Sequence, residues 1–161
     1  LPLAIQPRMS GRKIHLKGQI SLGVCQDICI PHTIKFNTTL PADQNMLGTK
    51  IKTALRQQPK TALAAGLRAR RCSFSPAPNG LMLKVTLDMP STGTPEHVVI
   101  ETSNPLIWAD PPTVSRTGKI LSLQTLLTHS AGQPFALTRN SIRITILGSD
   151  HAVDINGCTE G

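Results

Sequence analysis

Two cysteines separated by three residues, Cys25 and Cys29, are the residues of this chain best suited to chemistry. A disulfide between them would close a ring of about five residues, which loop-closure entropy makes worth only about 2 kcal/mol. Small disulfides that are strained or exposed exchange readily with other thiols, because attack on sulfur needs access and a good leaving thiolate. The spacing therefore predicts a redox couple at Cys25 and Cys29.

The other two cysteines, Cys72 and Cys158, are suited to a different task. A bond between them would close a loop of roughly 86 residues and stabilise the fold by about 4.6 kcal/mol. We therefore predict a structural disulfide here. Four cysteines allow three pairings, so this division is a hypothesis. A long-range bridge also favours an oxidising compartment.

Two alternatives for the close pair stay open. Cys25, Cys29 and His32 form a C-x3-C-x2-H pattern, and two thiolates with an imidazole suit Cu(I), or Zn(II) with a fourth ligand. In this interpretation the protein binds copper. In the other, the pair is a purely structural ring in a β-domain used for assembly.

The composition favours β structure with an aliphatic core. The 161 residues include 13 Pro and 12 Gly, which predict many turns and short elements, and only one Trp, three Phe and no Tyr. The net charge is +8, but the basic residues are dispersed and stacking aromatics are scarce, which argues against nucleic-acid binding. A basic surface that steers acidic partners fits better. No window approaches 18 consecutive apolar residues, so we predict no membrane-spanning segment.

Residues 1–41 are predicted to contain two strands on either side of the cysteine turn. From Ile14 to Val24 the apolar residues occupy the even positions and polar residues lie between them, the period of a strand with one buried face. The alternation resumes at Ile34. Pro31 is expected to fix the chain just past the second cysteine.

The rest of the chain is predicted to form a connector and a second module. Residues 42–66 form the connector, with a helix over 42–58 that Asp43 or Asn45 caps. Over 67–161 the period of two returns between turn clusters, which predicts a β-sandwich. The segments with this alternation are 81–89, 98–101, 142–146 and 152–155, and the stretch 119–127 fits either a strand or a helix face.

Residues 23–31, GVCQDICIP, with the alternating strands that flank them, resemble the N-terminal periplasmic region of the DsbD-like thiol:disulfide interchange proteins. The similarity is greatest to the branch named suppressor of copper sensitivity B (ScsB), because DsbD itself has a wider cysteine spacing. A looser resemblance continues to Cys158. Compared with this family, the chain is expected to begin partway through the first sandwich.

The resemblance implies a mainly β protein of immunoglobulin-like β-sandwiches: a partial first sandwich over 1–41, the connector over 42–66, and a second sandwich over 67–161. It also implies that the cysteine pair accepts electrons from a membrane-embedded reductase domain and passes them to periplasmic thioredoxin-fold proteins. The protein would then act as a protein-disulfide reductase in the periplasm, without an organic cofactor and without spanning the membrane itself.

Residue roles follow from the same resemblance. Cys25 and Cys29 would be the redox couple, with Cys29 attacking the partner disulfide first. Asp27, between them, would affect thiol acidity, and Pro31 would hold the start of the second strand. Copper is expected as a ligand only if the alternative site of Cys25, Cys29 and His32 is correct.

Overall fold

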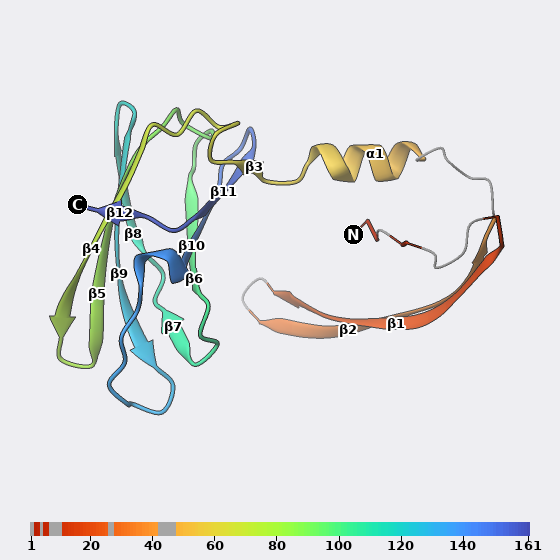
Figure 1. Ribbon diagram of the computed structural model, residues 1–161, viewed down its shortest axis with the longest axis horizontal. Helices are drawn as coiled ribbons and strands as arrows, with labels where there is room; N and C mark the ends of the chain where they lie inside the picture. Colours follow the sequence, from red (N-terminus) through yellow and green to blue (C-terminus); the bar gives the residue numbers. More distant parts are fainter. Residues whose placement is uncertain (1, 4, 7–10, 26–27, 42–47) are drawn as a thin grey trace. The chain divides into compact units, whose positions relative to one another are not determined.

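The computed structural model covers residues 1–161 and describes all of them except 1, 4, 7–10, 26–27 and 42–47. The chain divides into two compact units, Leu1–Arg56 and Gln57–Gly161, and each is described by itself (Figure 1). The protein is mainly β, as predicted. Among the described residues, no helix is long and apolar enough to cross a membrane.

The first unit contains a long hairpin. Strand β1 (Ile14–Cys25) pairs antiparallel with β2 (Cys29–Leu40), in register from Ile14 opposite Leu40 to Cys25 opposite Cys29. In β1 the even positions from Ile14 to Leu22 are partly buried and the odd positions are exposed, which confirms the predicted alternation. The predicted buried face is only partly covered, however, since no described residue of either strand is fully buried.

Gly18 of β1 makes room for an aromatic ring from β2. It lies opposite Phe36, and a Cβ atom at Gly18 would lie 2.8 Å from the ring carbon Cζ. The ring of Phe36 therefore occupies the place of the missing side chain. Such aromatic cover of a strand glycine helps to fix the register of the pair.

The helix α1 (Thr49–Arg56) is shorter than the predicted span of 42–58. Its apolar residues Ile51 and Leu55 lie one turn apart, and both are exposed. The predicted caps, Asp43 and Asn45, lie outside the described residues. A helix is thus present within the predicted span, and it belongs to the first compact unit, Leu1–Arg56.

The second unit is built from short strands. They are β3 (Lys60–Thr61), β4 (Ala69–Ala77), β5 (Gly80–Asp88), β6 (His97–Thr102), β7 (Ile107–Ala109), β8 (Thr113–Thr117), β9 (Ile120–His129), β10 (Ile142–Leu147), β11 (Ala152–Asn156) and β12 (Thr159–Glu160), with a 3-10 turn η1 (Arg139–Ser141) before β10. One sheet has the order β12-β4-β5-β9-β7, with β8 also paired to β9. The other has the order β3-β11-β10-β6. The two sheets lie face to face as a β-sandwich (Figure 1).

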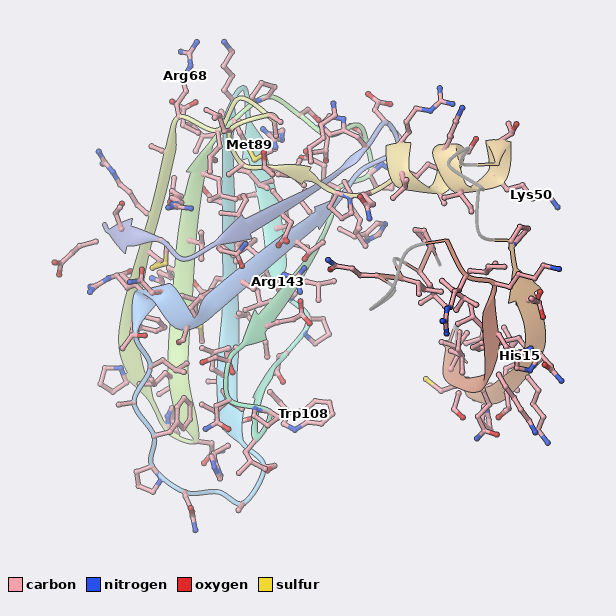
Figure 2. All side chains as sticks on the ribbon, turned by 45° about the vertical axis from the view of Figure 1, so that its right-hand side comes forward. His15, Lys50, Arg68, Met89, Trp108 and Arg143 are labelled. Carbon is pink, nitrogen blue, oxygen red and sulfur yellow. A yellow bond between two sulfur atoms is a disulfide. The ribbon has the colours of Figure 1, made fainter. Side chains whose placement is uncertain are left out.

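The core of this sandwich is aliphatic, as the composition predicts. Alternate residues of the facing strands point inward and are buried. They include Leu83, Val85 and Leu87 of β5, Leu121, Leu123 and Leu127 of β9, Ile142, Ile144 and Ile146 of β10, and Val153 and Ile155 of β11. Met89, which directly follows β5, is also fully buried; Figure 2 labels it. The rings of Phe74 and Phe135 pack only at the margin of this core.

The structure adds two details to the strands predicted from the sequence. The ambiguous stretch 119–127 is a strand, β9. Cys72 lies inside a strand, β4, which is not among the segments of alternation seen in the sequence. Only Cys72 and Phe74 point toward the core from the middle of β4, so this strand shows too little apolar alternation to be recognised.

Candidate functional site

The candidate site is the turn end of the β1–β2 hairpin. Cys29 is the first residue of β2; it is exposed and takes part in a disulfide. Cys25 is the last residue of β1, and its Cα atom is paired with that of Cys29. The side chain of Cys25, and residues 26–27, lie outside the described residues. The role expected of Asp27 therefore stays a prediction.

Small residues lie beside Cys29 on its own face of the hairpin. Successive side chains of a strand alternate between faces, so Pro31 shares the face of Cys29, and Gly23 lies directly opposite Pro31. Both residues are exposed. Pro31 lies within β2, and a proline is tolerated there because each strand of a hairpin has a free edge. No large side chain of this neighbouring pair blocks an approach to the sulfur of Cys29.

Apolar side chains surround the same end of the hairpin on its other face. Val24 and Ile30 form the next cross-strand pair and are 61% and 59% exposed. Ile28, in the turn, is 73% exposed. Exposed aliphatic side chains beside a disulfide-bonded cysteine are suited to contact with another protein.

Two residues of the alternative metal site, Cys29 and His32, lie on opposite faces of the hairpin. His32 is three positions after Cys29, and it lies opposite Leu22 on the even-numbered face of the hairpin. Cys29 lies on the odd-numbered face, so the two side chains leave β2 in opposite directions. Among the residues that the structure describes, no group of three or more His, Cys, Asp or Glu is placed to hold a metal ion.

The second cysteine pair is a structural bridge. Cys72 of β4 and Cys158, just before β12, form a disulfide with a Cα–Cα distance of 5.8 Å and a sequence separation of 86. Both are buried, at 2% and 6% exposure. This is the pairing expected from the sequence. It ties the C-terminal segment to the strand near the start of the sandwich.

A hollow on the sandwich was not anticipated from the sequence. It has a volume of about 510 Å³ and lies between the β4–β5 turn and the segment after β9. His129 and Phe135 line it, with their ring centroids 6.3 Å apart, and Nδ1 of His129 accepts a hydrogen bond from the backbone N–H of Ala131. Its lining residues come from separate stretches of the chain, so no local motif marks it. It contains no cysteine and no carboxylate.

The comparisons with known proteins bear on the fold. No protein-family model matches the chain, and no curated protein matches it. A solved structure, the crystal structure of the N-terminal periplasmic domain of ScsB from Proteus mirabilis, matches with a TM-score of 0.69 at 16% sequence identity. The match covers 91% of this chain and 58% of that chain, so this chain spans little more than half of that domain. At this level of identity, the likeness shows that the chain has the fold of a part of that ScsB domain.

Proposed function

We propose that this chain is a periplasmic thiol:disulfide interchange domain whose redox couple is Cys25 and Cys29. The observation that carries the proposal is that Cys29 is disulfide-bonded and exposed at the turn end of a hairpin, whereas the bridge of Cys72 and Cys158 is buried. The fold likeness to the N-terminal periplasmic domain of ScsB supports the DsbD-like assignment and the periplasmic location.

The two disulfides differ in what their reduction would cost. The proposed ring of Cys25 and Cys29 spans about five residues, so opening it sacrifices only about 2 kcal/mol of loop-closure entropy. The corresponding value for the Cys72–Cys158 bridge is about 4.6 kcal/mol. The proposed Cys25–Cys29 pair can therefore cycle between dithiol and disulfide while the buried bridge keeps the sandwich closed.

The reaction is dithiol–disulfide exchange with a thioredoxin-fold partner. The thiolate of Cys29 attacks one sulfur of the partner disulfide, an S–S bond forms between the two proteins, and the displaced partner thiolate takes up a proton. The thiolate of Cys25 then attacks the sulfur of Cys29. This closes the intramolecular disulfide and releases the second partner thiolate, which is also protonated.

Two electrons and two protons pass to the partner in this cycle, and the cysteine pair loses the same number. A dithiol must then restore the reduced pair. By the resemblance to DsbD-like proteins, a membrane-embedded reductase domain supplies it. Both steps, oxidation of the pair by the partner and its reduction by a dithiol, take place between sulfur atoms. The proposal therefore requires no metal or organic cofactor.

The copper-binding alternative receives less support. It needs His32 beside the two thiolates, and His32 lies on the face of β2 opposite to Cys29. The purely structural alternative predicts a disulfide that resists exchange. Measuring how readily the disulfide exchanges with other thiols therefore distinguishes this alternative from our proposal.

The test is to trap a mixed disulfide. The reduced Cys25→Ser variant is mixed with an oxidised thioredoxin-fold protein, and the products are separated by non-reducing electrophoresis and weighed by mass spectrometry. We expect a one-to-one covalent adduct, because the cysteine that would resolve it is missing. The matched control is Cys25→Ser/Cys29→Ser, which keeps the Cys72–Cys158 bridge and should give no adduct.

The reduction potential of the Cys25–Cys29 pair is a second measurement that can overturn the proposal. A potential below about −300 mV, together with no adduct, would place this disulfide among inert structural bridges and overturn the proposal. A higher reduction potential, together with a trapped adduct, supports disulfide exchange.

A further inference from the structure

The odd-numbered face of the hairpin combines the exposed cysteine with lysines. The strands pair so that Cys29 shares this face with alternate residues of β2 and with the odd-numbered residues of β1 opposite them. We call it the thiol face. It consists of Lys17, Gln19, Ser21 and Gly23 of β1 and Cys29, Pro31, Thr33, Lys35 and Asn37 of β2, all of which are exposed.

The thiol face is neutral near the cysteine and basic farther away. From Cys29 toward the base of the hairpin, the cross-strand pairs are Gly23 with Pro31 and Ser21 with Thr33. Lys35 comes next, opposite Gln19, and Lys17 follows, opposite Asn37. The two lysines are thus diagonal neighbours, about 7–8 Å apart at such positions. Neither strand contains an Asp or Glu, so the positive charge of this face has no acidic counterpart within β1 or β2.

The distance between Lys35 and Cys29 along β2 indicates whether the lysines act on the thiol or on a binding partner. Lys35 is six residues from Cys29, which corresponds to about 20 Å at roughly 3.3 Å per residue. This exceeds the screening length of about 8–10 Å at physiological salt, so the lysines have little effect on the thiol itself. It is within the span of a protein–protein interface that buries about 800 Å² on each side. The lysines are therefore placed to meet the surface of a partner whose disulfide lies at Cys29.

We propose that the thiol face is the docking surface for the redox partner, and that this partner carries acidic side chains about 20 Å from its own disulfide. This inference rests on the proposed exchange function. The small neutral pairs between the cysteine and the lysines let the partner lie flat on the hairpin. The lysines select it by charge, since complementary charges raise the rate of encounter and exclude like-charged surfaces.

The experiment uses synthetic peptide disulfides as probes. Each peptide carries one cysteine, an uncharged spacer of about six residues that spans 20 Å when extended, and then two Asp, two Lys or two Asn. The rate at which the reduced full chain cleaves each disulfide is followed at low salt. We expect the Asp peptide to react faster than the Lys peptide by about tenfold, with the Asn peptide between them, and the difference to vanish at high salt.

Charge-reversal variants connect the effect to this face. In Lys17→Glu/Lys35→Glu the order of the Asp and Lys peptides should reverse. The control Lys84→Glu/Lys119→Glu changes the net charge equally at two exposed lysines of the sandwich and should keep the wild-type order. A peptide with a spacer of about two residues, which places the charges near 7 Å, should show a smaller preference.

Failure of this inference is distinguishable from failure of the proposed function. A small neutral reagent, bis(2-hydroxyethyl) disulfide, reports exchange without docking. If it does not react with the reduced protein, the exchange function is overturned. If it reacts but the Asp and Lys peptides are cleaved equally fast, or both double variants behave alike, exchange stands and the docking surface is overturned.

Discussion

The carboxylate of Glu96 is held by the guanidinium group of Arg116, which lies twenty residues later in β8. Nη2 of Arg116 donates to Oε1 at 2.8 Å, and Nε donates to Oε2. The backbone N–H and Oγ1 of Thr92 also donate to Oε1, at 2.8 and 3.0 Å. The side chain of Glu96 is only 7% exposed. This network ties the segment between β5 and β6 to strand β8.

The network makes the stability of the protein depend on pH. Burial raises the pKa of Glu96, but the hydrogen bonds from Arg116 and Thr92 outweigh burial and hold the pKa below its usual value of 4.5. A carboxylate whose pKa is lowered by folding contributes stability that is present above the unfolded-state pKa and lost as the pH falls through the folded-state pKa. We therefore expect the free energy of unfolding to decrease from about pH 5 to pH 3, measured by urea denaturation.

Glu96→Gln removes this contribution. Because the partly buried guanidinium group of Arg116 loses its charged partner, we expect a loss of about 1.5–3 kcal/mol at neutral pH and a weaker decrease toward acid. Glu160→Gln is the control, since the side chain of Glu160 is 83% exposed in its pair with Arg139 and should change the stability little. Equal stability of Glu96→Gln and wild type at neutral pH would contradict the role of this network.

The two cysteine pairs should differ in their effect on stability. Cys72→Ala/Cys158→Ala removes a buried bridge across 86 residues, and we expect a loss of about 2–5 kcal/mol in the free energy of unfolding. Cys25→Ala/Cys29→Ala should cost no more than about 2 kcal/mol. Circular dichroism during urea denaturation gives both values. A larger loss from the Cys25/Cys29 substitutions than from removal of the buried bridge would argue that the hairpin ring is structural.

The parts of the fold that the sequence predicts are those with one continuous buried face. Strand β10 alternates Ile142, Ile144 and Ile146 with outward residues, so its period is visible in the sequence alone. Strand β4 has few inward apolar residues and escapes notice, although Cys72 lies at its centre. The Cys72–Cys158 disulfide could be predicted because loop length depends only on sequence separation.

The sequence alone does not tell which residues share a face of the hairpin, because this depends on where the strands lie and on their register. The spacing of Cys29 and His32 resembles a metal motif in the sequence. Both residues lie in β2, however, where residues three positions apart are on opposite faces, and the register with β1 puts His32 opposite Leu22. The same register puts Lys17 and Lys35 on the face of Cys29, although they come from different strands. Composition indicates a basic protein, but it does not tell which lysines share a surface.

His32 should therefore be dispensable for the chemistry of the cysteines. We expect His32→Ala to leave both the rate of disulfide exchange and any Cu(I) binding by the reduced protein unchanged, because the imidazole leaves β2 on the other face. Competition with a chromophoric Cu(I) chelator measures the metal affinity. Cys25→Ser/Cys29→Ser is the reference for loss of the thiolates. Loss of stoichiometric Cu(I) binding in His32→Ala would favour the metal site instead.

The turn between β10 and β11 is expected to tolerate no side chain at Gly148. A Cβ atom there would lie 2.1 Å from the carbonyl oxygen of Thr92, which accepts hydrogen bonds from the backbone N–H groups of Asp150 and His151. Thr92 is fully buried and cannot move outward freely. We expect Gly148→Ala to lower the free energy of unfolding by about 1–3 kcal/mol, as overpacking does. The neighbouring exposed substitution Ser149→Ala should stay within about 0.5 kcal/mol of wild type. If both variants unfold at the same urea concentration, the close approach of Gly148 to Thr92 does not limit this turn.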